Sequence, residues 1–228
     1  MTPRTNGRIA GVTFLLYIAT GIGSMVLFDQ AKGGGGEAAA QLANIAQHAT
    51  AVRLTAVLIL LQFLYAVVLG VTLYALTRDQ DRDLAVLALC CRVAEGVLAA
   101  VDTVRKLELV SVATASTTGG PEAATAQALG ALLLTDHSYA VAATCFAVGS
   151  TIFSWLLLRA RSIPVSLAGL GVVASVLLLV LLPGQIMGFV RGAVTGYMWF
   201  PMALFEVVLA LWLIFKGVAE PRTAPARS

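Results

Sequence analysis

The sequence is poor in charged residues, cysteines and histidines. Only 12% of its 228 residues are charged, which is about half the fraction typical of a soluble domain. The net charge of +3 is spread along the chain without a dense basic patch, so we expect no nucleic-acid partner. The three cysteines lie in apolar runs and form no CxxC pair, and there are only two histidines. We therefore expect no redox centre, no metal and no other cofactor.

Long apolar runs dominate the chain, which is 59% hydrophobic. Several runs reach the roughly 20 residues that a helix needs to cross about 30 Å of hydrocarbon. The pattern predicts an all-α integral membrane bundle, with one transmembrane domain over residues 1–217 and a disordered polar tail over 218–228. The first run is too long for a usual signal peptide, so we interpret it as a spanning helix. The six predicted spans are residues 8–28, 54–77, 84–104, 138–159, 165–186 and 195–216.

The links between the spans predict how the chain is oriented. With the N-terminus inside, the inner segments hold nine Lys and Arg residues and the outer links hold five. Because positive residues favour the inner side, we expect both termini in the cytoplasm and a multi-pass protein of the inner (plasma) membrane. Two outer links also predict short helices, one over 37–49 and one after the STTGGPE turn at 116–122.

The third predicted span and the residues just after it carry four charged residues on one narrow face. At 100° per residue and with Glu95 at zero, Lys106 falls at about 20°, Asp102 at about −20° and Arg92 at about 60°. Facing lipid, such a stripe would be very costly, so it is expected to face the bundle interior or a wet cavity. Asp102 lies closer to the outer interface than Arg92 and Glu95. Its alternative role is to snorkel to that interface beside Arg105 and Lys106.

The last predicted span adds a second carboxylate at similar depth. Glu206 lies about 15 Å along the helix from Lys216, near the middle of the membrane. Arg92 then has two candidate carboxylate partners, Glu95 and Glu206. One guanidinium cannot neutralise both, so a proton or a substrate cation would relieve the excess charge. The alternative is a structural ion pair that fixes helix packing. The candidate catalytic residues are Glu95, Asp102, Glu206 and Arg92.

Further polar and aromatic residues gather near the predicted outer half of the bundle and along its first two spans. The candidate substrate-binding residues are Tyr17, Gln62, Tyr65, His137, Gln185, Tyr197 and Trp199. Each has a plainer interpretation as well. Tyr and Trp at these depths usually form the aromatic belt at the membrane interface, and His137 simply begins a helix near the headgroups.

Several stretches together carry a resemblance that covers nearly the whole chain. They are RIAGVTFLLYIATG, VRLTAVLILLQFLYAVVLGVTLYALTR, DHSYAVAATCFAVGSTIFSWLLLRARSIPVSLAGLGVV and MALFEVVLALWLIFKGV. They resemble a bacterial multi-pass membrane family described as a domain of unknown function. The family's recurrent Arg, His and Glu match Arg92, His137 and Glu206. The chain departs from the family at Ser138, where Gly is usual, and at Ser154-Trp155, where Gly-Tyr is usual; these departures imply altered packing or a specialised pocket.

A second similarity is architectural. Small integral membrane terpene cyclases are similar in size and use acidic residues in an intramembrane cavity, although no motif aligns. A carboxyl group in a water-poor pocket can protonate an olefin or an epoxide, and aromatic faces stabilise the resulting cation. The favoured hypothesis is therefore a metal-independent acid–base enzyme that acts on a hydrophobic, isoprenoid-like substrate in an intramembrane pocket of the lipid bilayer, with a proton-initiated terpene cyclase as its specific form.

Two other classes of function remain open. The same midplane charges are typical of a proton-coupled transporter, although no inverted repeat is evident. A homodimer would supply the missing symmetry, with the stretch GVTFLLYIATGIG (11–23) offering small residues for helix contacts. A non-catalytic scaffold would instead keep its charges paired and buried without an open cavity.

Overall fold

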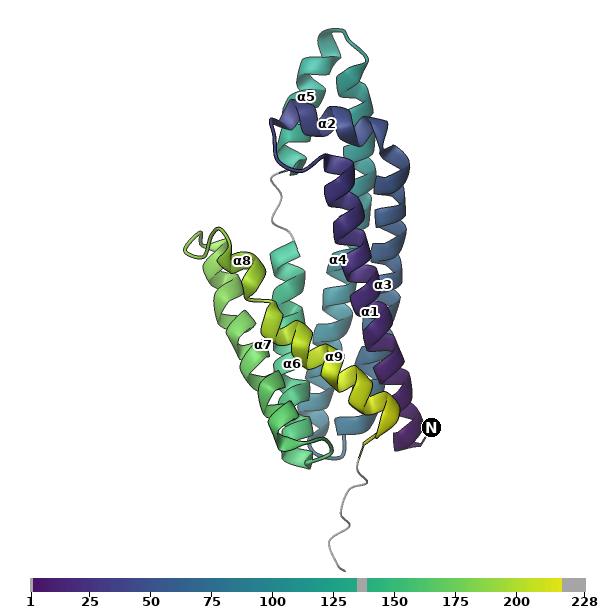
Figure 1. Cartoon of the computed structure of the whole chain (residues 1–228), viewed down its shortest axis with the longest axis vertical. Coiled ribbons are helices and arrows are strands. Elements are labelled where there is room, and N and C mark those ends of the chain that lie inside the picture. The colour runs from purple at the N-terminus through teal and green to yellow at the C-terminus, as the bar shows by residue number, and fades with distance from the viewer. Residues whose placement is uncertain (1, 135–138, 219–228) are drawn as a thin grey trace, which may run out of the picture. The chain divides into compact units, whose positions relative to one another are not determined.

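The computed structural model describes residues 2–134 and 139–218, and all regular secondary structure within these ranges is α-helical (Figure 1). The all-α prediction is therefore confirmed. The helices are α1 (Pro3–Lys32), α2 (Ala38–Gln47), α3 (Ala49–Thr77), α4 (Arg82–Thr117), α5 (Pro121–Leu134), α6 (Tyr139–Ala160), α7 (Val165–Ile186), α8 (Val194–Tyr197) and α9 (Phe200–Phe215).

Within the described ranges, six helical segments are long and apolar enough to cross a membrane. They contain α1, α3, α4, α6, α7 and the α8–α9 pair, so the number and approximate positions of the predicted spans are confirmed. The two short helices predicted in the outer links are also present, as α2 and α5. The cytoplasmic orientation of the termini stays a prediction.

Some helices are longer than the apolar runs predicted. The third span was expected to end at residue 104, but α4 continues to Thr117 over 36 residues, or about 54 Å at 1.5 Å per residue. Residues 105–118 include no proline or glycine, so no residue of this segment breaks the helix. Gly119, whose φ is 68°, follows the end of α4. Likewise α1 runs to Lys32 and is followed by Gly33 at φ 78°.

The last predicted span is interrupted. α8 and α9 are separate helices, with Pro201 in the first turn of α9. Proline lacks an amide hydrogen and fits the first helical turn, where that donor has no intrahelical partner. The break at Met198 and Trp199 therefore follows from a local sequence signal.

The chain forms two compact units, and it passes from one to the other within helices. Unit 1 comprises Met1–Leu15, Ala66–Glu95 and Ala143–Ser228, and unit 2 comprises Leu16–Tyr65 and Gly96–Ala142. The single domain predicted over 1–217 stays a prediction. The predicted disordered tail lies outside the described residues from 219 onward.

Unit 2 has an apolar core beneath α2 and α5. Leu42 and Ile45 on α2 are fully buried, and they pack with Val52 and Leu109 in one cluster. α5 approaches α2 closely because Gly130 has no side chain: a methyl group there would lie 2.6 Å from the Leu42 side chain. The short helices therefore pack against each other and against α3 and α4 within unit 2.

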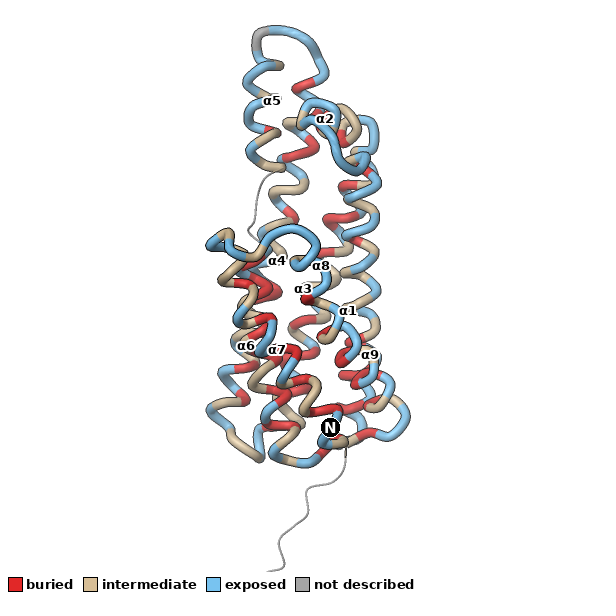
Figure 2. Tube along the Cα trace, turned by 60° about the vertical axis from the view of Figure 1, so that its left-hand side comes forward, coloured by how far each residue is buried: buried red, intermediate tan, exposed pale blue. Residues whose placement is uncertain are grey.

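In unit 1, several large apolar side chains are exposed while a charged side chain is buried, the reverse of the usual pattern in a soluble protein. Apolar residues such as Val173 and Val180 on α7 are 68% and 67% exposed, while Arg92 is 1% exposed. Figure 2 shows exposed positions along the helices themselves as well as at the turns. Large exposed apolar surfaces are unusual in a soluble protein and expected where lipid is the solvent.

Candidate functional site

The first component of the site is an ion pair within α4. Arg92 and Glu95 are three residues apart, which places both on one face of the helix. Arg92 Nη1 lies 2.8 Å from Glu95 Oε2, and the two side chains are 2% and 6% exposed. This region of α4 is otherwise apolar, so the ion pair lies in a low-dielectric environment.

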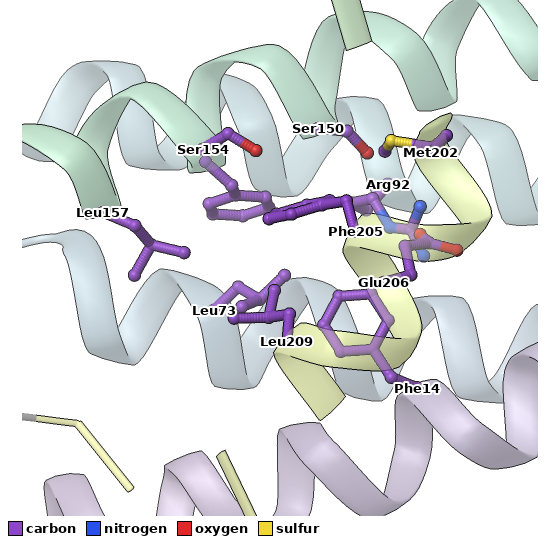
Figure 3. Close-up of a pocket in the computed structure, with 11 residues that line it drawn as sticks. Phe14, Leu73, Arg92, Ser150, Ser154, Leu157, Met202, Phe205, Glu206 and Leu209 are labelled. Atoms are coloured by element: carbon purple, nitrogen blue, oxygen red, sulfur yellow. The ribbon is translucent and has the colours of Figure 1, made fainter. Parts of the chain in front are cut away.

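Glu206 reaches the same region from α9. The buried face of α9 carries Met202, Phe205, Glu206, Leu209, Ala210 and Leu213, a spacing of three to four residues that repeats on one side of a helix. Glu206 is 6% exposed, and the charges of Arg92 and Glu95 both act on it. Figure 3 shows its carboxyl group beside the guanidinium of Arg92. We call Arg92, Glu95 and Glu206 the buried charge cluster.

An aromatic ring lies over the guanidinium of Arg92. The Arg92 Cζ atom lies 5.1 Å from the ring centroid of Phe146 on α6, within the range of a cation–π contact. The Phe146 ring in turn contacts Trp199, with centroids 6.0 Å apart. Trp199, a predicted substrate-binding residue, therefore joins the buried charge cluster through Phe146.

Two glycines make room for Arg92. A methyl group at Gly70 on α3 would lie 3.2 Å from Arg92 Cβ and 2.9 Å from Leu89 Cδ1. At Gly149 on α6, the same group would lie 3.1 Å from Cys91 Cβ and 3.6 Å from Arg92 Cδ. Close approach of helix backbones around buried polar side chains is typical of membrane bundles, where small residues form the helix contacts.

A small cavity adjoins the buried charge cluster. Its volume is about 10 Å³, which is enough for one water molecule. In Figure 3, Arg92, Glu206 and the Ser150 hydroxyl lie toward one end of the view, while Leu73 and Leu157 lie toward the other. The lining residues are Phe14, Leu73, Arg92, Ser150, Phe153, Ser154, Leu157, Met202, Phe205, Glu206 and Leu209.

The charges of the buried charge cluster do not balance. Arginine stays protonated in proteins, so the cluster holds one positive charge against two carboxyl groups. An uncompensated charge in a low-dielectric interior is expensive. One additional positive charge, such as a proton on a carboxylate, makes the cluster neutral.

Asp102, the fourth predicted catalytic residue, belongs to unit 2. Its Oδ2 lies 3.8 Å from Lys106 Nζ, and the side chains are 29% and 20% exposed. Lys106 Nζ also lies 3.7 Å from the ring centroid of Phe28. Asp102 thus has a local cationic partner, which fits the alternative that it lies near the membrane interface.

The remaining described binding residues of the prediction fall in both compact units. Tyr17, Gln62 and Tyr65 are half-buried in unit 2, where the Gln62 amide fills the space beside Gly21. Gln185 is half-buried near the end of α7. Tyr197 is 68% exposed and contacts the ring of Phe200, as in an interfacial aromatic belt.

The predicted binding residue His137 lies outside the described residues. Within residues 2–134 and 139–218, no three side chains of His, Cys, Asp or Glu group together as metal ligands would.

Sequence reasoning missed several residues at the cavity. Ser150 and Ser154 line it from α6, and Phe14, Phe205 and Met202 line it from α1 and α9. The two serines are four residues apart and so share one helix face, which is a signal that the sequence contains. The facing of Met202 and Phe205 has a weaker signal, because Glu206 is the one charged residue that marks a side of the otherwise apolar α9.

The fold and the site define a class of protein: a multi-pass helical membrane protein with charged residues buried among its spans. The family model "Domain of unknown function (DUF4386)" matches residues 9–217. The chain therefore belongs to this family, and the resemblance noted from its sequence is confirmed. Neither a curated protein nor a solved structure matches the chain.

Proposed function

We propose that this membrane protein binds and releases a proton at the buried charge cluster and couples that proton to the movement of a small molecule across the membrane. The observation that carries the proposal is the buried excess of carboxyl groups. Glu206 and Glu95 share one guanidinium in a part of unit 1 from which solvent is excluded. Ionisable residues inside membrane spans commonly mark proton relays and ion pathways.

The cavity favours transport over catalysis on a lipid. Ligand pockets are usually preformed and measure roughly 300–1,000 Å³, whereas the cavity beside Glu206 has about 10 Å³. A carrier passes through closed states in which its site is sealed from both sides. A closed, nearly filled site is therefore expected of one state of a transporter, and it is not the pocket that an isoprenoid chain needs.

The test measures the protonation of Glu206 directly. Infrared difference spectra of the purified protein between acidic and alkaline pH should contain a carboxylic C=O band that Glu206→Gln abolishes. Glu108→Gln, at an exposed position of the same helix as Glu95, is the matched control and should retain the band. A C=O spectrum identical in wild type and Glu206→Gln would contradict the proposal.

Transport itself requires a vesicle measurement. Protein reconstituted into vesicles with an internal pH dye, and with the membrane potential clamped, should dissipate an imposed pH gradient faster than Glu206→Gln does. Equal rates for wild type and variant, combined with a titrating Glu206 band, would retain the proton site and reject the carrier.

The second candidate is the acid–base enzyme for an isoprenoid-like substrate. The observation that favours it is the aromatic surface around the carboxyl groups, where Phe146 contacts both Arg92 and Trp199. Such faces stabilise carbocations. This candidate requires the helices of unit 1 to separate enough to admit a prenyl chain. Turnover of a prenylated substrate that Glu206→Gln abolishes would support it over transport.

The proposal also covers the partners, the membrane location and the orientation of the protein. The partners are the lipid bilayer and a small-molecule cargo, and the location is the plasma membrane with both termini in the cytoplasm. The homodimer has less basis, since Gly11 and Gly21 already contact Ala210 and Gln62 of the same chain. Reporter fusions at each terminus test the orientation, and a signal from the outer side would contradict it.

A further inference from the structure

We infer that Phe146 and Trp199 are positioning residues that couple the proton on Glu206 to the break between α8 and α9, by way of the Arg92 guanidinium. We call Phe146 and Trp199 the ring pair. This inference rests on the proposed function and names the residues through which its proton site acts on the helices. All residues that carry it belong to unit 1.

The ring pair connects the buried charge cluster with the start of α9. Arg92 Cζ lies 5.1 Å from the ring centroid of Phe146, and the ring centroids of Phe146 and Trp199 lie 6.0 Å apart. Both distances are within the range of attractive contacts, for a cation over an aromatic face and for two tilted rings. Phe146 is 5% exposed and Trp199 is half-buried. The contacts therefore run from the enclosed cluster toward the surface of unit 1.

Trp199 and Glu206 lie on the same side of α9. They are seven residues apart, which is close to two helical turns and leaves their directions about 20° apart. Trp199 directly precedes α9, and the carboxyl group of Glu206 lies beside Arg92 (Figure 3). Arg92 is thus linked to α9 twice, directly through Glu206 and indirectly through the ring pair. A movement of the guanidinium acts on α9 at two places, two turns apart.

Few ionisable groups face Glu206. The charged groups that act on it are Arg92 and Glu95, both from α4. The cavity residues on α1, α3 and α6 are uncharged, and α7, which packs against α9, contains no ionisable residue. The Cys145 thiol on α6 is titratable and interacts with Glu95. Protonation of Glu206 therefore acts mainly on the guanidinium of Arg92.

The force on that guanidinium changes when Glu206 binds a proton. While Glu206 is ionised, two carboxylates attract the guanidinium. Once Glu206 is neutral, only Glu95 attracts it, from 2.8 Å. In low-dielectric surroundings the attraction between opposite charges exceeds that between a cation and a ring. We therefore expect the guanidinium to move toward Glu95 on protonation and to alter its contact with Phe146.

The break between α8 and α9 is able to respond to this movement. The Trp199 amide donates to the Gly196 carbonyl oxygen at 3.3 Å, an i→i+3 bond that is longer than the 2.9 Å bond from the Ala203 amide to the Trp199 carbonyl oxygen. Pro201 has no amide hydrogen to donate. Short i→i+3 turns within a helical segment often mark a hinge, and the sites of many transporters are built from discontinuous helices. α9 can therefore tilt at the break with little loss of helical hydrogen bonds.

The experiment records the fluorescence of Trp199 during a pH titration of the full-length protein. Because the chain has three tryptophans, Trp155→Phe and Trp212→Phe are introduced together so that only Trp199 emits. We expect its emission maximum to shift with the same midpoint as the infrared C=O band of Glu206, and the shift to disappear in Glu206→Gln. Phe146→Leu should keep the C=O titration and lose most of the emission shift. Phe146→Tyr retains the ring and should retain the shift.

Trp212 on α9 is the matched control. It is half-buried, as Trp199 is, but it lies six residues from Glu206 and so points about 120° away around the helix. In the protein with Trp155→Phe and Trp199→Phe, the emission of Trp212 should not follow the C=O band. If Phe146→Leu does not fold, the comparison of the two tryptophans carries the test.

Three results overturn the coupling. One is a Trp199 emission that stays constant while the C=O band of Glu206 titrates, and another is an emission shift that survives Glu206→Gln. The third is a shift that persists in Phe146→Leu or occurs equally at Trp212. Failure of the proposed function is distinguishable, because the C=O band is recorded on the same protein. A missing C=O titration rejects the proton site, whereas a titrating band with an unresponsive Trp199 rejects only the role of the ring pair.

Discussion

The single helix α4 carries two ion pairs with contrasting surroundings. Arg92 and Glu95 lie 2.8 Å apart with side chains 2% and 6% exposed. Lys106 and Asp102 lie 3.8 Å apart with side chains 20% and 29% exposed. The first pair belongs to unit 1 and shares its space with Glu206, while the second belongs to unit 2 and has the Phe28 ring as its neighbour.

The comparison shows that neighbours decide what a charged residue does. Both pairs fall on one face of α4 and are three or four residues apart, so their positions on the helix do not distinguish them. A partly exposed pair such as Lys106 and Asp102 keeps some contact with solvent and contributes less to stability than its distance alone suggests. A buried pair cannot be disturbed without leaving a charge in an apolar interior. Protonation of a carboxylate therefore changes the charge that the surrounding helices enclose only at the buried pair of Arg92 and Glu95.

The largest effect is expected from Arg92→Met. This change leaves Glu95 and Glu206 together without their shared cation, and breaking a buried pair in this way costs about 3–5 kcal/mol. The free energy of unfolding, measured in detergent by denaturant titration, should fall by that order. Arg92→Lys keeps the charge but not the planar guanidinium stacked on Phe146, so it should lose less. A stability unchanged in Arg92→Met would show that the cluster is not electrostatically coupled.

An intermediate effect is expected from Gly70→Ala. The added methyl group would lie 2.9 Å from Leu89 Cδ1 and 3.2 Å from Arg92 Cβ, and forced repacking of this kind costs about 1–3 kcal/mol. Gly23→Ala in unit 2 is the control, because its methyl group would meet Leu58 at an ordinary 3.5 Å. Gly23→Ala should be neutral or stabilising by up to about 1 kcal/mol, since alanine favours helix over glycine. Equal losses at both sites would remove the packing argument.

The smallest effect is expected from Lys106→Gln. The partly exposed pair with Asp102 and the contact with Phe28 together contribute about 1 kcal/mol or less. The loss of unfolding free energy should also shrink at high salt, because salt screens exposed charges and hardly reaches buried ones. A salt-independent loss as large as that of Arg92→Met would mean that unit 2 also holds a desolvated charge site.

The sequence predicted the components that follow from helix periodicity. The face shared by Arg92, Glu95, Asp102 and Lys106 was evident from spacing alone, and the depth of Glu206 followed from the rise per residue. That Asp102 belongs to a different compact unit from Arg92, Glu95 and Glu206 could not be predicted, because a helix face says nothing of which neighbouring helix covers each turn. The continuation of α4 to Thr117 was missed because hydropathy marks the end of an apolar run and not the end of a helix.

The cavity was beyond prediction for a related reason. Ser150 and Ser154 share a helix face in the sequence, but whether they line the same cavity as Glu206 depends on how α6 and α9 pack. That packing depends on close approaches such as Gly11 against the Ala210 carbonyl oxygen, where a methyl group would lie 2.6 Å away. The sequence shows where such glycines are, but it does not show which helix each of them contacts.

The central claim is that Arg92 and Glu206 act as one buried unit, and a double-mutant cycle tests it most directly. The free energy of unfolding is measured for wild type, Arg92→Met, Glu206→Gln and the double variant. Arg92→Met should cost less in the Glu206→Gln background, because only Glu95 then lacks its cation, and the coupling should be about 0.5–3 kcal/mol. Additive effects, with a coupling of zero, would contradict the account and leave the two residues as independent buried groups.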